Sequence, residues 1–201
     1  MKNKALIIVD IQNDFCTGGS LAVPNAEEII PVVNQMMDSG EFDVIVATQD
    51  YHPQNHKSFA SVNNQEIGQI IKLNGLDQVM WPNHCVENTF GSDFHHQLKR
   101  NFDGIIQKGK NPEVDSYSGF LDNDKKQSTG LYEFLKNKNV DQVVVVGLAL
   151  DYCVKATALD AKKFGFKTSV KLSATRSVNI NEGDDLKSIE ELKLNNIQII
   201  E

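Results

Sequence analysis

The stretch QVVVVGLALDYCVKATALDA, residues 142–161, decides the fold class of this chain. It begins with a run of valines, and after Gly147 and a short turn its apolar residues recur at the spacing of a helix. A strand without polar alternation is typical of a parallel sheet that helices cover on both faces. The stretch therefore predicts a strand–turn–helix unit of an α/β protein.

The same kind of unit recurs along the chain. Short apolar runs of strand length occur at residues 5–9, 43–48, 104–107, 142–147, 168–172 and 197–200. Helical spacing of apolar residues occurs at residues 26–37, 130–138, 152–164 and 184–194. This order predicts a three-layer α/β/α sandwich around a mainly parallel, Rossmann-like six-stranded sheet, in a single domain that spans residues 1–201.

One long segment separates the second and third predicted strands. Residues 51–103 are rich in Asn, His, Pro and Ser, and they hold all five histidines and the single tryptophan. Loops of this length in compact domains are usually functional or disordered. Because of the histidines, we expect an ordered, metal-binding loop region.

Charge and composition limit the partners of the chain. The formal net charge of -7 argues against nucleic acid and favours a small neutral or weakly charged substrate. No run approaches the roughly 18 apolar residues of a spanning helix, so we expect a soluble protein without a membrane partner. The three distant cysteines do not suggest a disulfide framework, which favours the reducing cytoplasm. The sequence leaves open whether the chain forms a homo-oligomer.

Reactive side chains follow four of the predicted strands. They are Asp10 after the first strand, Asp50 and His52 after the second, Lys108 at the end of the third, and Asp151 and Cys153 after the fourth. Ligands of open α/β sheets bind beyond the carboxyl ends of the strands. We therefore expect these side chains to lie at one edge of the sheet.

Cys153 is the candidate nucleophile. It is expected in the first turn of a helix, where the helix N-terminus and a nearby Lys108 would stabilise a thiolate. Asp10, from the adjacent strand end, is the candidate base. Taken alone, Cys153 would be a buried small hydrophobe, Asp10 a capping or turn residue and Lys108 a solvated lysine. Their joint placement at strand ends favours the catalytic interpretation.

A candidate metal site lies in the long segment. It consists of Asp50 and His52 of DYHP and of His84 of WPNHCV. Two imidazoles and one carboxylate suit zinc, iron or manganese, with positions left for water or substrate. The alternative is that the two histidines cap turns beside Pro53 and Pro82.

Three further residues near these motifs have two interpretations each. Phe15 and Trp81 are stacking walls for a flat heteroaromatic ligand, or they belong to the core. His56 is a further metal ligand, or it only lines the site, and it is left out of the predicted ligand set.

The remaining cysteines and histidines are interpreted as structural. Cys16 and Cys85 have no assigned partner and are taken as packing residues. His95 and His96 are taken as the polar face of a helix.

Five motifs connect the chain to a known family. They are LIIVDIQNDFCTGGSLAV (6–23), VATQDYHPQNHKSFAS (46–61), WPNHCV (81–86), KGKNPEVDSYSGF (108–120) and GLALDYCVKATALDA (147–161). Through these motifs, in this order and spacing, the chain resembles from end to end the bacterial nicotinamidases of the isochorismatase-like cysteine hydrolase superfamily.

The resemblance implies a reaction and a catalytic apparatus. The reaction is hydrolysis of nicotinamide to nicotinic acid and ammonia in NAD salvage, with pyrazinamide as a second substrate. The implied catalytic triad is Asp10, Lys108 and Cys153, with a thioester on the cysteine. A cis peptide before Ala149 is implied to turn the amides of Ala149 and Cys153 into an oxyanion hole.

The resemblance also implies the ligands of the metal and of the substrate ring. Asp50, His52 and His84 match the positions that hold one divalent metal ion, with zinc expected and iron or manganese as alternatives. Phe15 and Trp81 match the positions that sandwich the ring.

Two other functions stay open. One is an amidohydrolase of the same superfamily that acts on a ureido or carbamoyl compound, although such relatives generally lack the metal site. The other is a catalytically silent metal-binding or redox-sensing module that uses Cys153 only as a reactive thiol. The isochorismatases of the superfamily lack the nucleophilic cysteine, so Cys153 favours an amidase.

Overall fold

A parallel six-stranded sheet forms the centre of the molecule. The computed structural model describes residues 3–201 and gives the strand order β5-β2-β1-β6-β7-β8, with each neighbouring pair parallel. The strands are β1 (Asn3–Val9), β2 (Val44–Asp50), β5 (Gly104–Lys108), β6 (Val140–Leu148), β7 (Lys167–Arg176) and β8 (Gln198–Ile200). The six predicted strands are confirmed, although β7 continues beyond its predicted end to Arg176.

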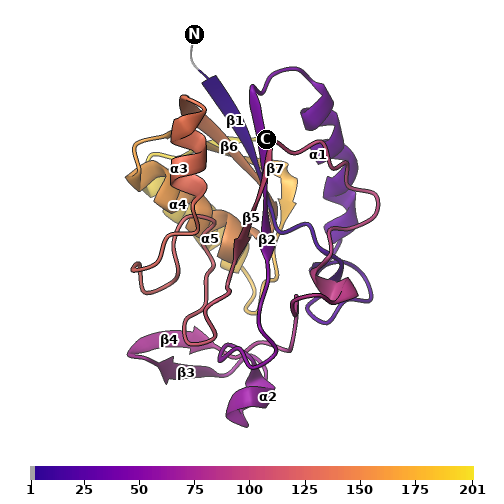
Figure 1. The fold of residues 1–201 in the computed structure, drawn as a ribbon, viewed down its shortest axis with the longest axis vertical. Coiled ribbons are helices and arrows are strands. Elements are labelled where there is room, and N and C mark those ends of the chain that lie inside the picture. The colour runs from indigo at the N-terminus through magenta and orange to yellow at the C-terminus, as the bar shows by residue number, and fades with distance from the viewer. Residues whose placement is uncertain (1–2) are drawn as a thin grey trace.

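Helices cover both faces of this sheet, as Figure 1 shows. One face carries α1 (Ile29–Asp38), and the other carries α3 (Leu131–Asn137), α4 (Lys155–Lys163) and α5 (Asp184–Leu194). Successive side chains of a strand point to opposite faces. Accordingly, Ile7 of β1 lies in the core beneath α3 and α4, and Ile8 lies in the core beneath α1. The predicted three-layer sandwich is therefore confirmed.

Short helical turns precede two of the predicted helices. The 3-10 turns are η1 (Asn13–Phe15), η2 (Ala26–Glu28) and η3 (Phe90–Ser92), and η4 (Leu150–Val154) is a π-helical turn. The helix predicted from residue 26 thus begins with η2, and the one predicted from residue 152 begins within η4. Cys153 lies in η4 rather than in the first turn of an α-helix, because the Val154 amide donates to the Ala149 carbonyl five residues earlier, at 3.0 Å.

The long segment 51–103 forms its own small structure beyond the carboxyl ends of the strands. It contains α2 (Ala60–Asn63) and an antiparallel hairpin of β3 (Ile70–Leu73) and β4 (Leu76–Val79). These elements lie at the lower end of the molecule in Figure 1. The sequence interpretation treated them as loop.

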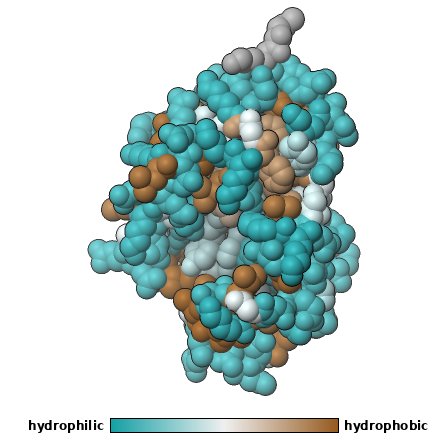
Figure 2. Space-filling model, turned by 90° about the vertical axis from the view of Figure 1, so that its left-hand side faces the viewer, coloured by the Kyte–Doolittle hydropathy of each residue, from teal (hydrophilic) through white to brown (hydrophobic). Residues whose placement is uncertain are grey.

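The face of the molecule shown in Figure 2 is mainly hydrophilic, with apolar patches towards its lower end. The exposed apolar side chains of α2 and the hairpin include Val62, Ile70 and Leu76. Within residues 3–201, none of the helices is both long and apolar enough to cross a membrane.

Candidate active site

The carboxyl ends of four strands meet at one point of the sheet. Asp10 follows β1, Asp50 ends β2, Lys108 ends β5 and Cys153 lies in η4 after β6. Asp50 and Lys108 are directly paired across β2 and β5. From β1 the chain continues to β2 on one side of the sheet, and from β6 it continues towards β7 on the other side. The boundary between β1 and β6 is therefore the switch point of the sheet, where ligands of such sheets bind.

Lys108 is the centre of a buried charged cluster at this point. Its Nζ lies 2.9 Å from Asp10 Oδ2 and 3.1 Å from Asp50 Oδ1. The same nitrogen lies 3.5 Å from Cys153 Sγ. All four side chains are buried. The structure therefore brings the predicted nucleophile, base and lysine together around one ammonium group.

Burial controls the protonation of this cluster. Desolvation outweighs the attraction of Lys108 and raises the pKa of the Asp10 carboxyl. Burial likewise raises the pKa of the Cys153 thiol well above its ordinary value, despite Lys108. For Lys108 itself, the nearby carboxylates outweigh burial and raise the pKa, so it stays charged. Cys153 therefore keeps its proton until a base removes it, which agrees with the expected need for a base, and Lys108 favours the thiolate once it has formed.

The predicted metal ligands form a second cluster beside the first. One ligand atom each of Asp50, His52 and His84 lies within 4.8 Å of the others. The Nδ1 atoms of the two histidines bond to backbone carbonyls, that of His52 to Gly109 and that of His84 to Pro82, both at 2.8 Å. A carbonyl only accepts, so each Nδ1 carries a proton, and in the neutral imidazole each Nε2 then has a lone pair.

These Nε2 lone pairs face a carboxylate oxygen. Asp50 Oδ2 lies 3.1 Å from His52 Nε2 and 3.5 Å from His84 Nε2. The His52 Nε2 atom is buried and has no hydrogen-bond partner among the described residues. Acceptors that face one another around a common centre fit a divalent cation, and histidines held by their second nitrogen are typical of metal sites. The donor set therefore fits the expected metal.

His56 lies beside this donor set. Its Nδ1 is 2.7 Å from Ser58 Oγ, and its buried Nε2 has no hydrogen-bond partner in the described part of the chain. Ligand atoms of His52, His56 and Asp115 also lie within 4.8 Å of one another. His56, which was left out of the predicted ligand set, thus borders the same polar cluster.

A small cavity of about 30 Å³ opens onto both clusters. Cys153 and His84 line it, together with Phe15, Trp81 and Ala149. A cis peptide bond joins Leu148 to Ala149, as the resemblance implied. The two aromatic side chains are buried yet contribute to the cavity wall, so they belong both to the core and to the pocket.

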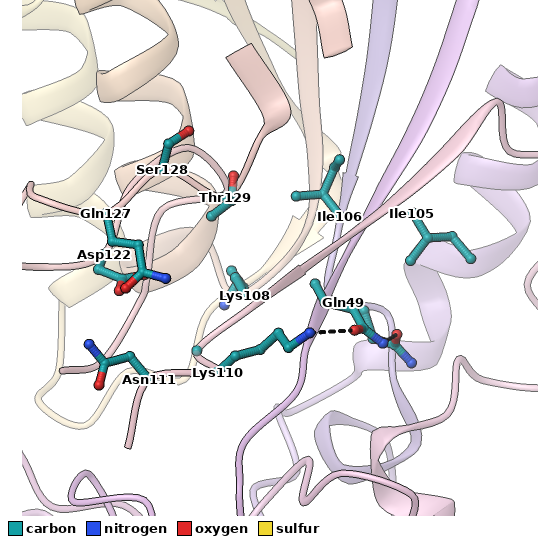
Figure 3. A pocket seen from close by; sticks show the side chains of 12 residues that line it. Gln49, Ile105, Ile106, Lys108, Lys110, Asn111, Asp122, Gln127, Ser128 and Thr129 are labelled. Atoms are coloured by element: carbon teal, nitrogen blue, oxygen red, sulfur yellow. Dashed lines mark hydrogen bonds between the residues drawn. The ribbon is translucent and has the colours of Figure 1, made fainter. Parts of the chain in front are cut away.

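A larger cavity of about 570 Å³ lies at the edge strand β5, and Figure 3 shows its lining. Polar side chains such as Gln49 and Asp122 surround it together with Ile105 and Ile106. Cys153 does not contribute to its lining. The smaller cavity is nevertheless the candidate active site, because it contains the Cys153 thiol and two of the metal donors, Asp50 and His84.

Several contacts of the site were not predicted from the sequence, although Thr48, Ser116 and Asp151 lie within the quoted motifs. The Thr48 hydroxyl donates to Asp10 Oδ1 at 2.6 Å, and the Ser116 carbonyl accepts from Lys108 Nζ at 2.9 Å. The Asp151 carboxylate accepts from the backbone amides of residues 178 and 179 at 3.0 and 2.8 Å. We call these two residues the 178–179 wall, since Val178 lines the small cavity. Asp151 thus holds a pocket wall against the turn that carries Cys153.

The outer histidines differ from the sequence interpretation. His95 and His96 lie in irregular structure after η3 rather than on a helix, because Ser92 is the last residue of that short turn. Cys16 and Cys85 are buried free thiols.

The fold and this site define the class of the protein as a hydrolase with a three-layer, Rossmann-like α/β/α sandwich and a cysteine at the switch point of its sheet. The chain belongs to the isochorismatase family, whose model, described as Isochorismatase domain, matches residues 4–201. The family membership indicated by the sequence motifs is therefore confirmed.

Three relatives show how far the similarity extends. The chain is 43% identical to the nicotinamidase of Escherichia coli (strain K12) over 195 residues, which cover 96% of this chain and 92% of that one. It matches the structure of the Acinetobacter baumanii nicotinamidase and pyrazinamidase with a TM-score of 0.95 and 41% identity, over 100% and 97% of the two chains. It matches the pyrazinamidase of Pyrococcus horikoshii in complex with zinc with a TM-score of 0.81 and 36% identity, over 99% of both chains.

Proposed function

We propose that this protein hydrolyses nicotinamide to nicotinic acid and ammonia, and that it also accepts pyrazinamide. The observation that carries this proposal is the position of the Cys153 thiol in one small cavity with Asp50 and His84, two of the three metal donors. The relatives named nicotinamidase and pyrazinamidase support the choice of substrate, since they match nearly the whole chain.

The substrate ring binds between Phe15 and Trp81, which both line the cavity. Asp50, His52 and His84 would hold one divalent ion, and zinc suits two imidazoles and a carboxylate. When bound, this ion supplies a Lewis acid for the pyridine nitrogen. The zinc complex of the Pyrococcus horikoshii relative supports this choice of metal.

Asp10 and Cys153 carry out the chemistry. Both contact Lys108 Nζ, at 2.9 and 3.5 Å, so the ammonium group stabilises negative charge on whichever of the two is ionised. Asp10 takes the thiol proton, and the sulfur attacks the carboxamide carbon. The backbone amides of Ala149 and Cys153 stabilise the resulting oxyanion, a type of contact worth about 3–4 kcal/mol per donor in other hydrolases.

The second half of the reaction releases both products. Asp10 returns its proton to the departing ammonia, which leaves an acyl thioester on Cys153. Water, deprotonated by Asp10, then attacks the thioester; the C–S bond breaks, Asp10 returns this proton to the Cys153 sulfur, and nicotinic acid is released. Because Lys108 remains charged throughout, it holds Asp10 in place between successive proton transfers.

An ammonia-release assay with nicotinamide, pyrazinamide and a ureido compound tests the reaction. We expect release from the two ring amides, loss of this activity in Cys153→Ala and retention in Cys85→Ala, which removes a thiol that does not line the cavity. Release of ammonia from nicotinamide by a folded Cys153→Ala protein would exclude the covalent mechanism. Preferred hydrolysis of the ureido compound would contradict the proposed substrate.

Metal content tests the second cluster separately. Asp50→Ala should lower bound zinc and nicotinamide hydrolysis together, whereas Asp77→Ala, on the exposed hairpin, should change neither. Full activity of completely demetallated wild-type protein would refute the role of the metal.

A further inference from the structure

A second group of metal-ligand side chains lies outside the catalytic cluster. Cys16, Glu27 and His95 each offer one ligand atom, and these three atoms lie within 4.8 Å of one another. The residues come from distant parts of the chain, namely the end of η1, the turn η2 and the segment after η3. Their convergence is therefore a result of the tertiary fold rather than of local sequence.

A cavity of about 290 Å³ gives access to this group. Cys16 and His95 line it, as do His96 and Phe90. Such a cavity has room for several waters, which a metal with three protein ligands needs to complete its coordination. Cys16 is 1% exposed and forms no disulfide.

The charges around Cys16 favour a cation. The Glu27 Oε1 atom accepts a 2.6 Å hydrogen bond from the Thr17 amide, which fixes the carboxylate beside the thiol. The hydrogen bond to His95 Nδ1 comes from the Gln97 amide and is long, at 3.4 Å, so it is a weak competitor for a metal.

We propose that Cys16, Glu27 and His95 form a second metal site, suited to zinc, whose remaining position is open to water from the adjoining cavity. A thiolate, a carboxylate and an imidazole are all ligands of this ion. Binding converts the Cys16 thiol into a metal thiolate and releases its proton to solvent, with no change of oxidation state. Since Phe15 directly precedes Cys16, metal binding also holds the segment that carries one wall of the substrate cavity.

Cobalt serves as the probe, because a cobalt–thiolate bond absorbs in the near ultraviolet and the catalytic donor set contains no cysteine. Demetallated full-length protein is titrated with Co²⁺ while absorbance and bound metal are measured. We expect two equivalents per chain and a thiolate band with the second. Cys85→Ser should keep both, whereas Cys16→Ser should bind one equivalent without the band.

Glu27→Gln tests the same site independently of the cysteine. Glu27 is only partly buried, and glutamine has nearly the same size, so the variant should fold. We expect the second equivalent to bind at least about tenfold more weakly. A wild-type protein that binds only one equivalent, or a thiolate band that persists in Cys16→Ser, would overturn the proposal. Neither result would bear on nicotinamide hydrolysis, because the two metal sites share no residue.

Discussion

Replacing Lys108 by methionine tests whether its positive charge stabilises the Asp10 carboxylate and the Cys153 thiolate. The substitution keeps a long apolar side chain but removes Nζ, which lies 2.9 Å from Asp10 Oδ2 and 3.1 Å from Asp50 Oδ1. Removing one partner of a buried ion pair costs about 3–5 kcal/mol. Divided between the two carboxylates, this is about 1.5–2.5 kcal/mol for each, or about one to two pKa units for Asp10.

The sign of the shift follows from the role of Asp10. Asp10 acts as a carboxylate, so activity is present above its pKa and is lost as the pH falls through that value. Lys108 lowers this pKa, which burial has raised, so its loss raises the pKa further. The acid limb of kcat/KM should therefore move to higher pH by about one to two units.

A second effect concerns the thiol. Lys108 Nζ lies 3.5 Å from Cys153 Sγ and stabilises the thiolate once it forms. Hydrogen bonds to charged groups contribute about 1.5–3 kcal/mol, so their loss lowers the plateau of kcat/KM by about 10- to 100-fold. The plateau and the acid limb can be read from the same pH profile.

The assay is ammonia release from nicotinamide across pH, with thermal unfolding to confirm that the variant is folded. Lys110→Met is the matched control, because Lys110 is exposed on the same segment and its Nζ contacts only Gln107 at 3.4 Å among the described side chains. A folded Lys108→Met protein whose acid limb coincides with that of the wild type would refute the roles given to Asp10 and Lys108.

Three further substitutions test other parts of the structure. In Gly109→Ala the new Cβ would lie 2.4 Å from His52 Cε1, so metal content should fall, whereas Gly165→Ala, with nothing within 4 Å, should cost only about 1–2 kcal/mol of stability and retain the metal. Equal metal content in the two would contradict the role of Gly109. Asp151→Asn should lose one of the two hydrogen bonds to the 178–179 wall and raise KM more than it lowers kcat, as measured by steady-state kinetics; an unchanged KM would refute this link. Leu135→Ala, at a fully buried position, should lower the free energy of unfolding by about 2–5 kcal/mol in denaturant titrations, and a loss below that range would indicate that the core repacks.

The strands and their reactive ends were predictable because parallel strands combine two strong signals. Unbroken apolar runs such as VVVV mark buried strands, and the carboxyl ends of such strands share one edge of the sheet. Asp10, Lys108 and Cys153 could therefore be grouped from the sequence alone. The metal donors followed in the same way, since Asp50 ends β2.

The hairpin β3–β4 was missed although it carried a signal. Asn74 and Gly75 lie between its strands, both with positive φ, and Asn-Gly is a strong short-range indicator of a two-residue hairpin turn. Its strands are short and largely exposed, so the apolar pattern that identified the central strands was absent.

The protonation of Cys153 depends on a quantity that sequence does not contain. The positions of Cys153 and Lys108 at strand ends predicted that the thiol lies near the ammonium group. Lys108 does lower the pKa of the thiol, as expected. The desolvation that outweighs it depends on how completely the surrounding chain buries the sulfur. The hydrogen bonds of Thr48 to Asp10 and of Lys108 to the Ser116 carbonyl could not be predicted from the sequence either, because they join segments that only the fold brings together.

The small volume of the cavity beside Cys153 has a consequence for affinity. At about 30 Å³ the cavity is narrow for a six-membered ring, so we expect that binding of a ring requires its walls to move apart. The observed affinity for any ring is then the affinity of the open form multiplied by the fraction of molecules that are open. Substitutions in the walls can change this fraction without touching the ring, and they would shift the affinities of substrate, product and ring-shaped inhibitors by the same factor.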